Sequence, residues 1–262
     1  MSVKSEMELK LSNGRIVSAE VKDGVCKLVI EAEEEKVAEV TKKPEIFDPF
    51  ILVEASKLSL DDEFMQYEPK KEREKEFKEF LTDVIKEGIP DFYRPKLDPS
   101  LDKKGKLSYI PGEKPAVVES FKWWSEAANE FCPECNSRLG TDSQYIAFLG
   151  VLMKKLVESG WSVEETWSAV SRNPHKLGHY RNSHDGRLGF EPTGSREICG
   201  FCDLANTYKI LAADEENIDF WLAGGSYKDF SCDQPLYEIW HDGSWKITYP
   251  NFDAVGWIVL DP

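Results

Sequence analysis

Several features are scarce or missing in this sequence of 262 residues. No apolar run approaches the roughly 18 residues that cross a membrane, and the first ten residues lack the apolar core of a signal peptide. The six cysteines are too few for a disulfide scaffold in a chain of this length. We therefore expect a protein that is synthesised in a cytoplasm and does not insert into a membrane.

Positive charge is also scarce. The chain has 33 Lys and Arg against 48 Asp and Glu, a formal net charge of −15. Such a charge repels nucleic acid and anionic membranes, so neither is expected as a partner. The sequence also lacks a nucleophile elbow, a phosphate-binding loop and a dinucleotide-binding signature. A hydrophobic content of 41% and an aromatic content of 12% are nevertheless sufficient for a folded core.

The pattern in the first part of the chain predicts a β-rich module. Residues 7–30 alternate apolar and polar positions around two hairpin signals, Asn13-Gly14 and Asp23-Gly24, which indicates a three-stranded antiparallel meander. Residues 50–53 predict a fourth strand. Apolar positions at helical spacing predict a helix over residues 70–87, ended by Gly88. We assign residues 1–90 to an attachment or assembly module.

The rest of the chain is predicted to be a linker followed by an α+β domain. Residues 91–115 are rich in Pro, Lys and Asp, which favours an extended linker. In residues 116–262, a helix is expected after Pro115. The capping signatures at Thr141-x-x-Gln144 and Ser162-x-x-Glu165 predict two more. A further helix is expected from Asp203 to about Ala213, and residues 217–262 predict a small antiparallel sheet with long loops.

Two Cys-x-x-Cys pairs are the sharpest motif. Cys132, Cys135, Cys199 and Cys202 could give four thiolates to one structural zinc. The 63 residues between the pairs exceed the usual zinc-ribbon spacing of about 15–20, so they would have to form a helical insertion. Buried free thiols and a redox or disulfide pair are the two alternatives.

Three histidines lie close together in sequence: His175, His179 and His184. A pair four residues apart could face one metal on a helix. However, Lys176 occupies the position where the zinc-protease motif has its glutamate, and Pro174 and Gly178 oppose a long helix. A polar connector is the simpler interpretation, and a metal-dependent enzyme is the alternative.

The final sheet carries aromatic, Ser and Asp residues in its predicted loops. Tyr and Trp supply contact area at low entropic cost, and Ser, Asn and Asp adapt their hydrogen bonds, a combination typical of binding surfaces. The alternative is an ordinary sheet whose aromatic side chains form the core. Composition alone does not separate the two interpretations.

The order of motifs in this region resembles the end of a C-type-lectin-like domain. Phe220-Trp221-Leu-Ala-Gly-Gly is followed by Leu236-Tyr-Glu-Ile-Trp240-His-Asp-Gly243 and then by Val255-Gly256-Trp257-Ile-Val-Leu260. The resemblance covers roughly residues 140–262. It is greatest to the variable proteins of diversity-generating retroelements and to phage receptor-binding proteins. The calcium-binding signature of sugar-binding lectins is missing, because Gln234-Pro235 is followed by Leu236.

The resemblance implies a non-enzymatic protein that binds a protein or cell-surface ligand in a phage or prophage setting. The implied ligand-binding residues, by position, are Tyr227, Asp229, Phe230, Ser231, Asp233, Trp240, Asp242, Trp245, Tyr249, Asn251 and Phe252. A purely structural virion or assembly protein, whose aromatic side chains form core or subunit interface, is the alternative. Either setting allows a homo-oligomer or association with a virion.

Overall fold

The computed structural model divides the chain into two compact units, Met1–Glu45 and Ile46–Pro262. Each unit is described by itself. The structure describes residues 15–22, 25–31, 49–117, 120–172, 176–177, 193–194, 197–204, 207–212, 220–224, 236–237, 239–241 and 254–262.

The first unit contains an antiparallel hairpin. Strands β1 (Arg15–Lys22) and β2 (Val25–Glu31) pair from Lys22 opposite Val25 outward, as the Asp23-Gly24 signal predicts. The register shifts between Ile16 and Ser18, which marks a β-bulge. The first strand of the predicted meander falls on residues 7–12, outside the described residues.

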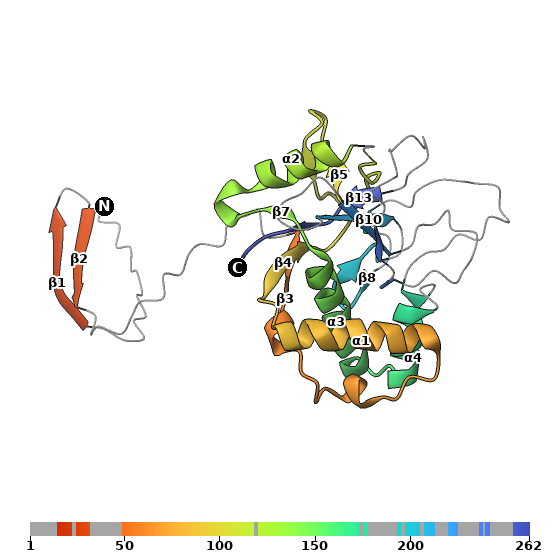
Figure 1. Ribbon diagram of the computed structural model, residues 1–262. Helices are drawn as coiled ribbons and strands as arrows, with labels where there is room; N and C mark the ends of the chain where they lie inside the picture. The colour runs from red at the N-terminus through yellow and green to blue at the C-terminus, as the bar shows by residue number, and fades with distance from the viewer. Residues whose placement is uncertain are drawn as a thin grey trace. The chain divides into compact units, whose positions relative to one another are not determined.

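The second unit has an α+β fold in three layers, in which helix α2 covers one face of the sheet region and helices α1, α3 and α4 cover the other (Figure 1). Alternate residues of the strands pack into different clusters. Ile210 and Leu222 join the cluster around α2, whereas Leu211 and Ala223 join the cluster around α1, α3 and α4. The period of two along a strand therefore divides the core between the two faces.

The described strands of this unit are short and form several small sheets. They are β3 (Phe50–Val53), β4 (Phe92–Pro95), β5 (Ser100–Leu101), β6 (Leu107–Ser108), β7 (Arg138–Leu139), β8 (Glu197–Ile198), β9 (Phe201–Cys202), β10 (Tyr208–Ala212), β11 (Phe220–Ala223), β12 (Ile239–His241), β13 (Ala254–Gly256) and β14 (Ile258–Val259). The largest sheet has the order β12-β11-β10-β13. Its β10–β11 and β11–β12 pairs are antiparallel and its β10–β13 pair is parallel. The β11–β12 pair, within residues 217–262, is antiparallel as predicted, but the sheet as a whole is mixed because it includes β10.

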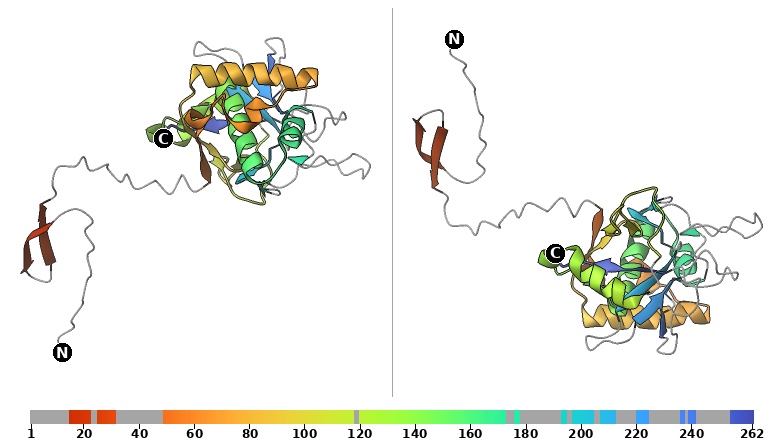
Figure 2. Two further views of the ribbon diagram at one scale, coloured as in Figure 1. Left: turned by 90° about the horizontal axis from the view of Figure 1, so that it is seen from below. Right: turned by 90° about the horizontal axis from the view of Figure 1, so that it is seen from above.

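Four helices are described, and two of them, after Thr141 and Ser162, begin where the sequence places their caps. They are α1 (Glu72–Glu87), α2 (Phe121–Phe131), α3 (Asp142–Glu158) and α4 (Val163–Ser171), with short 3-10 turns at Ala55–Lys57, Glu63–Gln66 and Pro133–Cys135. The Thr141 hydroxyl accepts from the Gln144 N–H, and Ser162 caps α4 in the same way. Gly88, with φ of 78°, ends α1. Helix α1 runs across α3 within this unit (Figures 1 and 2).

The helix predicted from Asp203 to about Ala213 is wrong. Asp203 has φ of 56°, outside the right-handed helical region, and residues 208–212 form strand β10. The helical spacing of Leu204, Tyr208 and Leu211 was overridden because β10 gains backbone partners on both sides, β11 and β13.

Residues 91–115 are part of the second unit, which differs from the predicted linker and domain boundary. Strand β4 pairs with β3, so residues 50–53 and 92–95 lie in one small sheet. The prolines are accommodated at strand ends: Pro95 is the last residue of β4, and Pro99 accepts a hydrogen bond from the Ala116 N–H. The boundary between units therefore lies at residues 45–46 rather than after α1.

Large aromatic side chains fill the core of the second unit. Trp124 and Trp167 are 0% exposed and Trp257 is 2% exposed. The ring of Trp257 makes edge contacts with Phe92 and Tyr145 at centroid distances of 5.8 and 5.4 Å. Across the described residues, no helix combines the length and the apolar character that spanning a membrane requires.

Candidate functional site

The predicted recognition surface falls mostly outside the described residues. Of its eleven positions, only Trp240 is described, in the backbone of strand β12. The other positions belong to the two connections that join β11 to β12 and β12 to β13. Their attachment points on the sheet are described, and these define where the predicted surface begins.

The β11–β12 connection has both of its ends, and the β12–β13 connection has one of its ends, at the same end of the four-stranded sheet. The pairing register aligns Ile239, Ala223, Lys209 and Val255 in one row across β12, β11, β10 and β13. The chain leaves β11 at Ala223 and enters β12 at Ile239, both in this row, and it enters β13 one residue before the row. It leaves β12 at His241, two residues away toward the other end of the sheet. Neighbouring strands lie about 4.8 Å apart, so the two ends of the β11–β12 connection are adjacent, and the start of β13 lies two strands, roughly 10 Å, from β11. We call this row, with the residues beside it, the attachment end of the sheet.

The β11–β12 connection is also anchored to the helices near its second attachment point. Leu236 is 0% exposed, and its N–H donates to the Val170 carbonyl at 2.9 Å. The Tyr145 hydroxyl donates to the Leu236 carbonyl at 3.1 Å. Tyr237 stacks on Phe77 at 5.0 Å. These contacts fix the end of the connection without involving the predicted ligand-binding residues.

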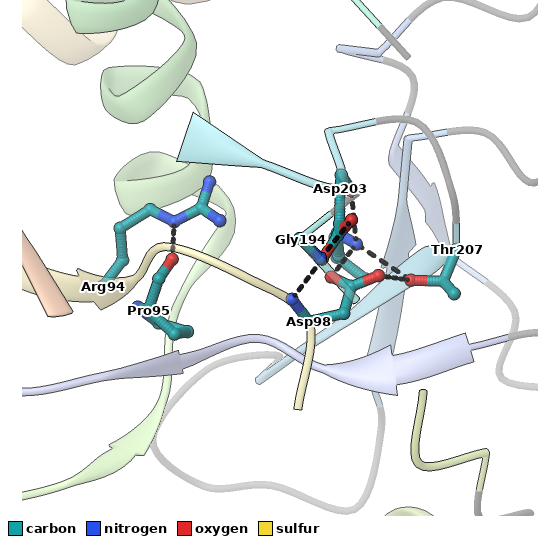
Figure 3. A network of polar contacts seen from close by, with 7 residues as sticks. Arg94, Pro95, Asp98, Gly194, Asp203 and Thr207 are labelled. Atoms are coloured by element: carbon teal, nitrogen blue, oxygen red, sulfur yellow. Dashed lines mark hydrogen bonds and ion pairs between the residues drawn. The ribbon is translucent and has the colours of Figure 1, made fainter. Parts of the chain in front are cut away.

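A buried polar cluster lies under the attachment end (Figure 3). It consists of Asp98, Asp203, Thr207 and Lys209, which are 3%, 7%, 0% and 3% exposed. The Lys209 ammonium forms an ion pair with the Asp98 carboxylate. It also donates to the Thr207 hydroxyl at 2.8 Å, and Thr207 in turn donates to Asp98 at 2.6 Å.

Asp203 connects this cluster to two other segments. Its carboxylate accepts from the Asp98 N–H at 3.0 Å and from the Gly194 N–H at 2.9 Å. The cluster therefore joins the segment after β4, residue 194 and the start of β10. Because breaking a buried ion pair leaves an uncompensated charge, the cluster holds these three segments in one arrangement.

Burial dominates the electrostatics of the cluster. It raises the pKa of Asp203 to about 6, and the nearby Asp98 carboxylate adds to this shift. Burial also lowers the pKa of Lys209, although the Asp98 carboxylate opposes that change. With 3–7% exposure, these groups are covered, and they are better placed to position the backbone than to act on a substrate.

Arg94 is a second buried cation, to one side of the cluster in Figure 3. It is 2% exposed, its Nε donates to the Pro95 carbonyl at 2.8 Å, and its guanidinium carbon lies 4.3 Å from the centre of the Phe148 ring. Burial lowers the pKa of Arg94 to about 10, so it stays charged at neutral pH. The guanidinium thus packs against aromatic rings between β4 and α3.

Sequence reasoning missed this cluster. Asp98 lies in the predicted linker and Lys209 in a predicted helix, 111 residues apart. The one local signal is a lysine inside the apolar run Tyr208–Ala212, which becomes informative only once that run is assigned as a strand.

The four predicted zinc ligands do not form one group in this structure. Cys132 and Cys135 are joined by a disulfide, and Cys199 and Cys202 are free thiols. Among the residues the structure describes, the potential metal ligands that gather within 4.8 Å are Cys132, Glu134 and Cys135. Cys202 packs in the cluster around α2, and Cys199 packs against the other cluster. Zinc binding by all four stays a prediction that requires reduction and rearrangement.

His175, His179 and His184 lie outside the described residues, so their use by a metal-dependent enzyme stays a prediction.

Burial raises the pKa of the Cys202 thiol to about 11, which disfavours the reactive thiolate there.

Comparisons with known proteins add little. No protein-family model matches the chain, and no curated protein matches it. A solved structure described as the crystal structure of CarF aligns with a TM-score of 0.36 and 12% identity, covering 66% of this chain and 88% of that chain. A similarity at that level carries no argument about fold or function.

Proposed function

We propose that the protein is a non-enzymatic binding protein that recognises a protein or cell-surface ligand through residues 225–235 and 242–253. The observation that carries the proposal is the attachment end of the sheet, where residues 225–235 leave β11 and lead back to β12, and where residues 242–253 lead into β13. Binding domains commonly present variable loops from the end of a well-packed scaffold such as this sheet.

The division of aromatic residues also supports this function. The described rings of the region, Tyr237 and Trp257, are 3% and 2% exposed and belong to the core. The core of the second unit therefore has its own aromatic side chains. The Tyr, Trp and Phe residues predicted for binding are additional to these.

The test compares the free energy of unfolding of Tyr227→Ala and Trp245→Ala with that of Trp257→Ala. A ring displayed for binding should cost less than about 0.5 kcal/mol when removed, whereas Trp257→Ala should cost about 3–5 kcal/mol. Urea titration measures all three. Losses of about 3 kcal/mol for Tyr227→Ala and Trp245→Ala would instead support the structural virion or assembly protein, whose rings form core or interface.

The phage setting is tested separately. If the protein belongs to a diversity-generating retroelement, its gene should have a reverse transcriptase and a template repeat nearby. Phage tail genes in that position would support a receptor-binding or virion protein. Neighbouring genes of unrelated metabolism would oppose both.

A further inference from the structure

A groove lies between helix α2 and the β5–β6 hairpin, and its lining includes none of the residues of the proposed function. It encloses about 350 Å³ and is lined by Gly105, Lys106, Leu107, Trp123, Glu126, Ala127, Glu130 and Phe131. That volume is near the lower end of the range of about 300–1,000 Å³ found for ligand sites. The question is which ligand its walls fit.

The walls of the groove are held in place before any ligand binds. On the hairpin side, the Asp102 carboxylate accepts from the N–H groups of Lys104 and Lys106 at 2.7 and 2.9 Å. On the helix side, Ser120 caps α2 by accepting from the Trp123 N–H at 3.2 Å. The Trp123 ring packs edge-on against the fully buried Trp124, with centroids 4.9 Å apart. A preformed groove loses little entropy on binding.

The lining of α2 follows one stripe of the helix. Positions 123, 126, 127, 130 and 131 have the spacing of a single face, which is distinct from the buried face of Trp124 and Ala128. This stripe combines aromatic surface with two carboxylates. Leu101, 39% exposed, lies directly across the hairpin from Leu107 and extends the apolar surface beside the groove.

The charges in the groove favour a cation. Glu126 and Glu130 contribute two negative charges and Lys106 one positive charge, which leaves a net charge of −1. Glu126 pairs with Lys122 at 3.7 Å, but both side chains are more than 60% exposed, so that pair is weak. Among the described residues, no cation forms an ion pair with Glu130. The chain as a whole has a net charge of −15, which attracts a basic partner.

We propose that this groove binds an arginine side chain on a basic segment of a partner protein. The hydrocarbon part of the arginine side chain packs against Leu107 and Phe131. Its guanidinium stacks on the Trp123 ring and pairs with the Glu130 carboxylate. Arginine suits such a site because its planar cation stacks on aromatic rings and pairs with carboxylates.

The test is an NMR titration of the ¹⁵N-labelled full chain with the blocked peptide Gly-Leu-Arg-Leu-Gly. The same peptide with citrulline or glutamate in place of arginine serves as the comparison. The indole signal of Trp123, identified by its loss in Trp123→Phe, reports binding at the groove. We expect saturation with a dissociation constant of about 1 mM or below. The citrulline and glutamate peptides should bind at least about threefold more weakly.

Three variants make the test specific. Glu130→Gln should weaken arginine-peptide binding about threefold. Glu79→Gln, the same change at an exposed position of α1, should leave it unchanged. Lys106→Gln should strengthen it, because a repelling charge is removed. Equal binding of the citrulline peptide, equal effects of Glu130→Gln and Glu79→Gln, or no saturable shift of Trp123 would each overturn the proposal. Preferential binding of the glutamate peptide would do the same.

Discussion

Asp203 is 7% exposed and lies beside the Asp98 carboxylate, so the protonation of Asp203 affects the stability of the fold. Its pKa of about 6 in the folded protein exceeds the value of about 3.9 expected in the unfolded chain. Between these two values the folded state binds more protons than the unfolded state. The contribution of Asp203 to stability therefore increases as the pH falls through 6 toward 4, opposite to the behaviour of a salt-bridged aspartate.

We expect this contribution to appear in a comparison of the wild type with Asp203→Asn. Between pH 7.5 and pH 5, the free energy of unfolding of the wild type should rise relative to the variant by about 1.4 kcal/mol. Urea titrations across that range measure the difference. Asp83→Asn, an exposed change on α1, controls for the loss of one carboxylate. A constant difference between wild type and Asp203→Asn would show that the carboxyl does not titrate in this window.

The cysteines allow a second test at the scale of single residues. The disulfide between Cys132 and Cys135 predicts that denatured, unreduced protein has at least two fewer titratable thiols than reduced protein. A thiol titration in denaturant measures this. In the same unreduced preparation, elemental analysis should find less than about 0.2 zinc per chain, because thiols held in a disulfide do not bind metal. One zinc per chain and no change on reduction would support the four-thiolate site instead.

At the scale of elements, helix α2 approaches the sheet so closely that one position has no room for a side chain. A Cβ atom at Gly256 would lie 2.3 Å from a ring carbon of the buried Trp124. The close contact lets the Trp124 ring cover strand β13 directly. It also ties α2, and with it one wall of the proposed groove, to the sheet.

Gly256→Ala should therefore lower the free energy of unfolding by about 1–3 kcal/mol through overpacking. If the clash is with the ring, the double variant Gly256→Ala/Trp124→Leu should lose less than the sum of the two single losses. Denaturant titration of all four proteins gives the coupling. Strictly additive losses would show that the strain caused by Gly256→Ala does not come from the Trp124 ring.

The elements also show how far the sequence could predict the structure. Helices α1, α3 and α4 follow from local signals, such as the reciprocal Thr141 and Gln144 cap, because a cap and an apolar stripe act within one helix. Strand β10 does not, because its conformation depends on β11 and β13, which lie later in the chain. The polar cluster could not be predicted for the same reason, because nothing near Asp98 in the sequence indicates that Lys209 will lie beside it.

At the scale of the whole molecule, the position of the unit boundary decides which residues the second unit needs. Its larger core cluster includes Val53 of β3 and Phe77 and Leu81 of α1, all 0% exposed, packed with residues of α3 and α4. The sequence had placed β3 and α1 in a separate module. The structure instead makes them part of the core that supports the attachment end of the sheet.

Two truncations distinguish these divisions. Residues 46–262 should unfold cooperatively, with a melting temperature within about 3 °C of the full chain, because Ile46–Pro262 is a compact unit of its own. Residues 91–262, cut at the boundary predicted from sequence, should not fold, because they lose three fully buried side chains of the core at about 2–5 kcal/mol each, a loss as large as the whole stability of a typical domain, about 5–15 kcal/mol. Calorimetry and circular dichroism measure both. A cooperative transition in residues 91–262 would instead support the predicted linker and an independent module that contains β3 and α1.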